Sequence, residues 1–131
     1  MDTKQLNKVV VHFKNHTLLK GTTGDFFPNK TQFHLIDPEG KATTITVNQL
    51  KAIFFVKDFV GNKLHQDNYE LNMPGTGRKI WVEFFDGEVI IGHTLGYSPD
   101  RQGFFLTPAD PESNNERIFV VKESTKIIKF L

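Results

Sequence analysis

Cysteine is absent from this chain of 131 residues, and its absence removes three kinds of site at once. Disulfide bridges, thiolate metal centres and cysteine nucleophiles are excluded, and the composition fits a reducing cytoplasm. An excess of charge is also absent, because 16 basic and 15 acidic residues leave a formal net charge of +1. Bulk charge therefore gives no argument for a nucleic acid or an acidic membrane surface as the partner.

Long apolar runs are lacking as well. No stretch approaches the roughly 20 apolar residues that a membrane-spanning helix needs. The polar stretch of residues 1–8 does not have the pattern of a signal peptide. We therefore expect a soluble cytoplasmic protein with no membrane partner.

Phenylalanine is abundant, with 13 copies against one tryptophan and two tyrosines. Phenylalanine side chains fill β-rich cores, but a chain this short has little core to fill. Some of these side chains are therefore expected to face outward, where they would bear on the choice of partner.

The chain matches itself when Lys8 is laid over Lys79. The pairs that then coincide include Val11 and Val82, Phe13 and Phe84, Gly21 and Gly92, Pro28 and Pro99, and Phe33 and Phe104. Matches that keep their order across the whole unit indicate a duplication. We predict one unit in residues 1–57, a connector over 58–78 and a second unit in residues 79–131.

Each unit is expected to contain five short strands. The expected ranges are 8–14, 17–26, 32–37, 42–47 and 51–57 in the first unit, and 80–85, 88–97, 104–106, 117–122 and 126–131 in the second. Asp86-Gly87 between two β-rich runs predicts a hairpin with a type I′ turn, and Gly92 predicts a sharp bend in the following strand. The predicted fold class is all-β, with two tandem five-stranded small barrels and little or no helix.

Residues 86–97 contain a turn glycine, a mid-strand glycine and a further glycine before an aromatic residue. This stretch is similar to the first signature of the Sm/LSm family, and residues 120–128 occupy the place of the second signature. The second unit thus resembles the Sm/LSm family and, more loosely, the SH3-like barrels, which implies a small barrel of that type. The whole chain also resembles an uncharacterised bacterial family with this tandem arrangement.

The resemblance does not extend to the residues that bind RNA in Sm proteins. That family holds a base with an aspartate and an asparagine, and those places carry Ser98 and Gly103 here. The Arg-Gly pair of the second signature is replaced by Lys122-Glu123. The resemblance therefore implies a fold and not an RNA site.

No constellation of catalytic, metal-binding or cofactor-binding residues stands out. His12 and His16 have the spacing of a metal pair on a helix, but they fall on a strand and its turn. His34, His65 and His93 show no ligand spacing, and the carboxylates lie in turns whose chemistry accounts for them. We predict that the protein is not an enzyme and has no metal and no cofactor.

Strand alternation predicts which apolar residues lie outside the barrels. Val82, Phe84 and Val89 are expected to face the core of the second unit. The outward-facing candidates are Phe54, Trp81, Phe85 and Ile90. The two units diverge at three of these places, where Trp81 replaces Val10, Phe85 replaces Lys14, and Phe54 stands opposite Lys129 in the alignment. Exterior apolar side chains usually mark a contact with another element, so these four residues predict an interface.

The function expected from these residues is a binding or adaptor module that acts through protein–protein contacts or self-association. One alternative is single-stranded RNA binding through the barrel loops. The residues that would serve it are Tyr97, Arg101, Asn114, Asn115 and Arg117. Another alternative is a sensor of a small ligand such as a nucleotide, and the glycine-rich basic residues 75–79 are a candidate anion-binding segment.

Overall fold

The computed structural model describes residues 6–60, 77–110 and 112–131. The first half consists of β1 (Asn7–Phe13), β2 (Leu18–Thr23), β3 (Gln32–Ile36), β4 (Ala42–Thr46), the 3₁₀ turn η1 (Val47–Gln49) and β5 (Leu50–Val56). The second half consists of β6 (Arg78–Phe84), β7 (Val89–Thr94), β8 (Gly103–Pro108), β9 (Asn115–Val121), the 3₁₀ turn η2 (Lys122–Ser124) and β10 (Thr125–Phe130). The all-β prediction is confirmed, and these described ranges contain no α-helix. Most of the predicted connector, residues 61–76, lies outside the described residues.

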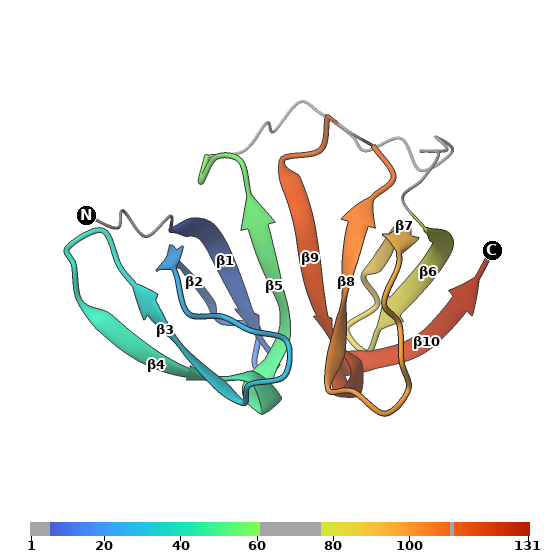
Figure 1. The fold of residues 1–131 in the computed structure, drawn as a ribbon, viewed down its shortest axis with the longest axis horizontal. Coiled ribbons are helices and arrows are strands. Elements are labelled where there is room, and N and C mark those ends of the chain that lie inside the picture. The colour runs from blue at the N-terminus through green and yellow to red at the C-terminus, as the bar shows by residue number, and fades with distance from the viewer. Residues whose placement is uncertain (1–5, 61–76, 111) are drawn as a thin grey trace.

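Hydrogen bonds join the ten described strands in one antiparallel sheet with the order β10-β6-β7-β8-β9-β5-β1-β2-β3-β4 (Figure 1). Both halves use the same order of pairing, with the first strand of each half between its second and fifth strands. The sequence predicted two separate five-stranded barrels. The sheet instead stays open and continuous, because β5 pairs with β9 of the other half rather than with β4.

The central strands β5 and β9 are shared by the two hydrophobic cores. Successive side chains of a strand point to opposite faces of the sheet, and β5 is buried along its whole length. Ile53 and Phe119, which are cross-strand partners, face the first core, whereas Phe54 and Ile118 face the second. Each half therefore contributes side chains to the core of the other.

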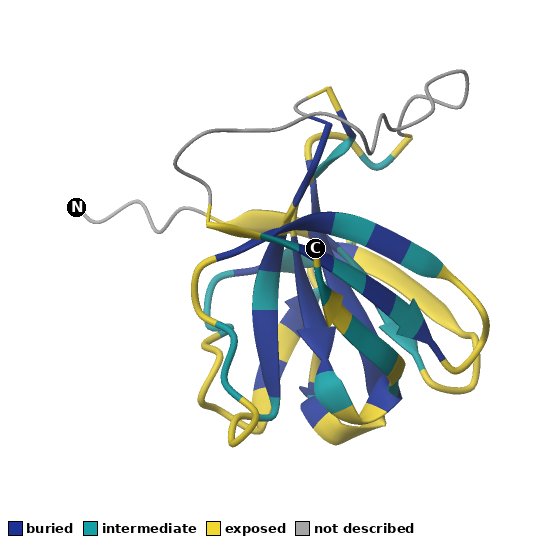
Figure 2. Ribbon diagram, turned by 90° about the vertical axis from the view of Figure 1, so that its right-hand side faces the viewer, coloured by how far each residue is buried: buried dark blue, intermediate teal, exposed yellow. Residues whose placement is uncertain are grey.

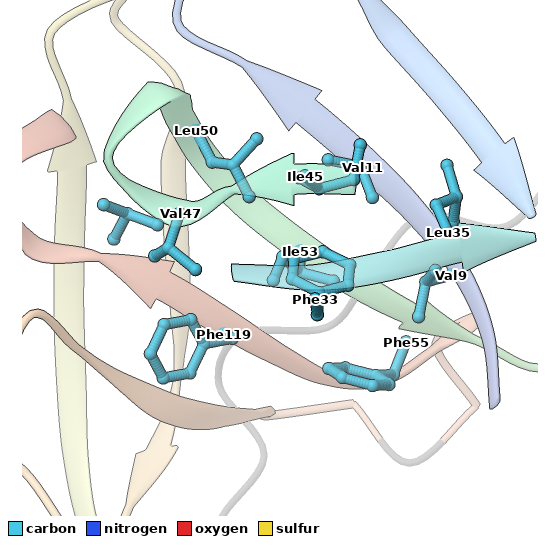
Figure 3. Packing of buried hydrophobic residues seen from close by; sticks show 11 residues of the cluster. Val9, Val11, Phe33, Leu35, Ile45, Val47, Leu50, Ile53, Phe55 and Phe119 are labelled. Atoms are coloured by element: carbon cyan, nitrogen blue, oxygen red, sulfur yellow. The ribbon is translucent and has the colours of Figure 1, made fainter. Parts of the chain in front are cut away.

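The first core gathers apolar residues of β1, β3, β4, η1 and β5 in the first half and of β9 (Figure 3). Its buried members are Val9, Val11, Phe33, Leu35, Ile45, Val47, Leu50, Ile53, Phe55, Phe119 and Val121. The second core contains Ala52, Phe54, Val56, Ile80, Val82, Phe84, Ile90, Phe104, Leu106, Ile118 and Val120. Burying one such side chain stabilises a fold by about 1.5–3 kcal/mol, and burial is concentrated in the strands while most turns are exposed (Figure 2).

The β6–β7 turn differs from the predicted type I′ turn. A type I′ turn needs positive φ at two central residues, but of these turn residues only Gly87 has one, at 92°. The Gly87 N–H donates to the carbonyl of Phe84 at 3.0 Å, and the Phe84 N–H donates to the carbonyl of Glu88 at 2.9 Å. The loop is therefore one residue longer than a two-residue hairpin and ends in one left-handed residue. In the first half His16 takes the same place with φ 73°.

This longer loop also shifts the register of β7 by one residue, which corrects the prediction for Ile90. A two-residue loop would place Val89 opposite Phe84 on the core face. The structure instead pairs Ile90 with Val82 and Val89 with Glu83. Ile90 is consequently buried in the second core and does not face outward, because a slip of one residue moves a side chain to the other face.

Candidate functional site

The four predicted interface residues lie in different environments. Phe54 is buried between the halves, with its ring 4.2 Å from that of His12, and Ile90 is buried in the second core. Trp81 is half-buried on β6, where Lys129 Nζ lies 5.2 Å from the ring centroid. Phe85 is 69% exposed in the β6–β7 turn. The structure does not gather these residues, and of the four Phe85 is the one that is mainly exposed.

Phe85 lines a cleft of about 310 Å³ where the two halves meet. The cleft lies between the β1–β2 turn, the start of β5, the β6–β7 turn and η2. Its other lining residues are Lys14, His16, Lys51, Phe84, Asp86, Glu123 and Ser124. Since both halves contribute lining residues, the cleft exists only when they are joined.

A buried lysine forms the ionic centre of this cleft. Lys51 is only 9% exposed, and its Nζ lies 2.7 Å from Asp86 Oδ2 and also donates to Glu88 Oε1. The same ammonium lies 4.8 Å from the ring centroid of Phe84. Burial lowers the pKa of Lys51, but the hydrogen bonds to the two carboxylates outweigh burial and raise the pKa overall.

Asp86 is held in its ionised form by the same contacts. Burial raises the pKa of Asp86, but the hydrogen bonds from Lys51 and from the Glu88 N–H outweigh that effect and lower the pKa overall. Its Oδ1 accepts the Glu88 N–H at 3.0 Å, which is a normal bond of an aspartate in a turn. The charges at the centre of the cleft are therefore paired with one another, and neither group is poised to transfer a proton at neutral pH.

His12 lies beside this ionic centre at the end of β1. Burial, reinforced by the charge of Lys51, lowers the pKa of His12 to about 4, although Glu88 and Asp86 act in the opposite direction. The imidazole is therefore neutral at neutral pH and packs against Phe54 as part of the junction.

The backbone around Phe85 is fixed by the fold. The Phe85 N–H donates to the carbonyl of Ser124 at 3.1 Å, and the Lys14 N–H makes the equivalent bond to Gln49 in the first half at 3.0 Å. The side chains at these two places differ, since one is a phenyl ring and the other an ammonium that lies 3.5 Å from Glu123. The fold therefore requires the backbone position but not the exposed ring.

The residues considered for RNA binding do not form one surface. Arg101 lies before β8, whereas Asn114 and Asn115 lie at the opposite end of the sheet, beside the end of β5. Asn114 bonds to the backbone of Asp58 through both of its side-chain groups, at 3.1 and 2.9 Å. Arg101 is therefore separated from Asn114 and Asn115 by the length of β9.

The two remaining RNA candidates have structural roles. The ring of Tyr97 packs edge-on against Phe104 and Phe130, with centroids 5.2 and 5.4 Å apart. The guanidinium of Arg117 lies 4.4 and 4.5 Å from the ring centroids of Phe55 and Phe105. Burial lowers the pKa of Arg117, although Glu116 raises it. The Tyr97 side chain is therefore half-buried in packing, whereas Arg117 is exposed with its guanidinium held against two rings.

Residues 6–60, 77–110 and 112–131 contain neither a cluster of metal-binding side chains nor a membrane-spanning helix. No cluster of three or more histidine or acidic side chains in these ranges could hold a metal ion. In the same ranges no helix is long and apolar enough to cross a membrane. His65 and residues 75–76 of the candidate anion-binding segment lie outside the described part of the chain.

Fold and site together define an all-β protein in which one open sheet, shared by two similarly connected halves, forms a cleft at their junction. The model of a family of unknown function, DUF6982, matches residues 5–131, and the chain belongs to that family. No curated protein and no solved structure was found to match it.

The ionic centre of the cleft was not predicted from the sequence. The sequence predicts only that Asp86 lies in a turn and that Glu88 and Lys51 each begin a strand. The sequence contained one signal that Lys51 is buried. Lys51 begins the run Lys51-Ala52-Ile53-Phe54-Phe55-Val56, and all residues of this run after Lys51 are apolar. A cation in a strand buried on both faces needs a carboxylate partner.

Proposed function

We propose that this protein is a non-enzymatic, cytoplasmic protein-binding module, and that its partner docks in the cleft at the junction of the two halves. The exposed ring of Phe85 carries this proposal. An exposed phenyl group costs free energy in water, and the equivalent place in the first half holds a lysine. Because the fold does not require the ring, we infer that the ring contacts a partner that is absent from the isolated chain.

The cleft suits an apolar side chain flanked by charged groups. Phe84 and Phe85 supply an apolar surface, while Lys14 and Glu123 form an exposed ion pair at the rim with atoms 3.5 Å apart. Exposed ion pairs are worth little to a fold and exchange partners readily. A segment of a partner protein with an aliphatic or aromatic residue next to a charged one would use both features.

We also propose that each half is a small unit of the Sm or SH3-like type. Support comes from the strand pairing, which has the same order in both halves, and from Gly21 and Gly92, which are equivalent and lie close to the backbone of the neighbouring strand. In this interpretation the pairing of β5 with β9 joins the two units side by side.

A peptide display library panned on the full chain tests the docking proposal. Peptides selected on the wild type are titrated against Phe85→Lys, which copies the residue of the first half, and against Leu131→Lys, which changes an equally exposed apolar residue elsewhere (66% exposed). We expect Phe85→Lys to weaken binding by about tenfold or more, since buried aromatic anchors dominate such interfaces. Leu131→Lys should bind like the wild type. Equal binding to both variants, or no selection of peptides, would contradict the proposal.

A further inference from the structure

A second hollow lies away from the junction cleft, between the β2–β3 loop and the β7–β8 loop. Two adjoining hollows of about 590 and 290 Å³ share Pro28 and Arg101 in their lining. The smaller one also contains His93, Leu95, Gly96 and Phe104. Their combined size is that of sites that bind small organic molecules, which range over about 300–1,000 Å³. We refer to these residues as the loop groove.

The two walls of the loop groove are tied together by hydrogen bonds. The side-chain amide of Gln102 donates to the carbonyls of Pro28 and Lys30, at 2.8 and 2.7 Å. The Lys122 N–H in turn donates to the carbonyl of Gln102 at 2.9 Å. Loops of both halves are thus joined, so the groove is formed before any ligand arrives, and preformed sites lose less free energy on binding.

His93 lines the smaller hollow and carries an unsatisfied polar atom. The residue is only 4% exposed, and its Nδ1 is buried without a hydrogen-bond partner among the described residues. Leaving a buried polar atom unpaired costs about 1–3 kcal/mol, and such an atom calls for an explanation. In the same strand, Thr94 has its hydroxyl satisfied by the carbonyl of Phe105 at 2.8 Å. The Nδ1 atom of His93 therefore differs from the neighbouring Thr94 hydroxyl, which has its hydrogen bond.

Arg101 adds a positive charge that no described residue neutralises. The side chain is exposed at the edge shared by both hollows. Only its backbone N–H has a partner, the carbonyl of Ser98 at 3.3 Å. A guanidinium presents a planar fork of donors that matches a carboxylate or a phosphate. Arg101 is therefore free to bind an anionic group.

The remaining wall is apolar and open. Leu95 is among the most exposed apolar residues of the described part of the chain, and Phe104, which is itself buried, also lines the smaller hollow. A Cβ atom at Gly96 would meet nothing within 4 Å, so packing does not account for the glycine there. The missing side chain keeps the groove wide between the apolar surface and Arg101.

We propose that the loop groove binds a small organic anion, with its carboxylate or phosphate on Arg101 and its apolar body over Leu95 and Phe104. The carboxylate and the phosphate share the same recognition by the guanidinium, and the experiment distinguishes them. His93 lies beside the bound molecule and gains a polar neighbour. This site is separate from the junction cleft, so it stands whether or not Phe85 binds a protein.

Three probe molecules test the proposal on the full chain: 3-phenylpropionate, phenyl phosphate and the neutral 3-phenylpropanol. Titrations are followed by the ¹⁵N–¹H backbone resonances and by the ring nitrogens of His93. We expect at least one of the two anions to give saturable shifts at millimolar concentration, centred on residues 93–107 and including the ring of His93. Saturation by one anion alone identifies its headgroup as the preferred one. The alcohol should bind at least about tenfold more weakly, since a charge-assisted bond is lost.

Two variants and one control locate the binding site. Arg101→Gln removes the charge, and Gly96→Val fills the groove without removing a polar group; both should weaken binding about tenfold or more. Lys41→Gln, which removes an exposed charge in the β3–β4 turn, should leave binding unchanged. The proposal is overturned if neither anion saturates, if the alcohol binds as well as the anions, or if both groove variants bind like the wild type.

Discussion

Lys51 of β5 and Asp86 of the β6–β7 turn form an ion pair across the junction of the two halves, with Nζ and Oδ2 2.7 Å apart. The two residues are 35 positions apart in the chain, and the intervening segment includes the whole of the predicted connector. The ammonium is nearly buried, whereas Asp86 and Glu88 are more accessible to water. Because Lys51 is more buried than the two carboxylates, we expect the fold to tolerate removal of the lysine charge better than removal of the carboxylate charges.

Removal of both carboxylates should destabilise the protein strongly. In the double variant Asp86→Asn, Glu88→Gln, the ammonium of Lys51 stays buried without a counter-charge, and the expected loss in the free energy of unfolding is about 3–5 kcal/mol. Asparagine keeps the oxygen that accepts the turn N–H, so the turn itself is preserved. Urea unfolding at neutral pH, followed by tryptophan fluorescence, measures the loss.

Lys51→Met is the matched control for that variant. Methionine can lie on the ring of Phe84 in place of the lysine stem, and the two carboxylates that remain can be hydrated. The expected cost is about 1 kcal/mol, or none. A larger loss for Lys51→Met than for the double carboxylate variant would contradict the assignment of Lys51 as the buried partner.

Phe54 and Lys129 occupy equivalent places in the two halves, and the junction accounts for their difference. Phe54 pairs with Val10 on β1 and is covered by the second core, while Lys129 pairs with Trp81 on β6 at the edge of the sheet. Phe54→Lys should cost about 3–5 kcal/mol, through a lost aromatic contact and a charge moved toward the core. Lys129→Phe should leave the free energy of unfolding within about 1 kcal/mol.

The difference between Phe54 and Lys129 should also affect association between chains. Lysine on an edge strand discourages pairing with another sheet, and β10 carries both Lys126 and Lys129. We expect Lys129→Phe to increase association in sizing chromatography with light scattering, while Phe54→Lys lowers stability without promoting association. If Lys129→Phe elutes as the wild type does at high protein concentration, the edge lysine does not have this role.

Much of the fold could be predicted because the residues that begin, end or interrupt strands affect only the backbone next to them. Asp86-Gly87 predicts a turn and alternation predicts Val82 and Phe84 as core, and both features are present. At Gly92, where the sequence predicts a bend, the structure shows a close approach to the backbone of Thr107. The register of β7 was wrong because it depends on loop length, and one extra residue in the turn moved Ile90 inward. The alignment of the two halves could not reveal that β5 pairs with β9, since strand pairing between distant segments leaves no local pattern.

The candidate site could be predicted only in part, for a similar reason. The mismatch between Phe85 and Lys14 in the alignment pointed to an exposed ring, which the structure places at the cleft. The ionic centre and the loop groove each combine residues of both halves, so their members are far apart in sequence. Burial of Lys51 and the unpaired Nδ1 of His93 become visible only once the halves are joined.

The glycine at position 92 should not tolerate even one added methyl group. A Cβ there would lie 2.2 Å from the carbonyl oxygen of Thr107, and at the equivalent Gly21 it would lie 2.5 Å from that of Ile36. Backbone contacts this close cannot relax by moving a side chain, so Gly92→Ala should cost about 1–3 kcal/mol or more. Gly96→Ala, in open space, is the control and should change stability by less than about 0.5 kcal/mol. Thermal unfolding of both variants gives the comparison.

Acid should destabilise the protein before its carboxylates titrate, and His12 is the main cause. Its pKa is lowered from 6.5 in the unfolded chain to about 4 in the folded one. Between these values the unfolded chain binds a proton that the folded chain does not, so the free energy of unfolding falls as the pH falls from 6.5 toward 4. One such group contributes at most about 1.4 kcal/mol per pH unit.

Other titrating groups act in the same direction as His12, and the carboxylates differ from it in the pH window in which they titrate. Burial, with a smaller effect of Lys79, also lowers the pKa of His93, so His93 adds to the same loss. The pKa values of Asp25 and Asp86 are lowered from 3.8, so the stability they contribute is present above that pH and is lost only below it. We expect His12→Gln to flatten the dependence of the urea midpoint on pH between 6.5 and 4, and His12→Gln, His93→Gln together to flatten it further. An undiminished slope in the double variant would show that other groups bind the proton.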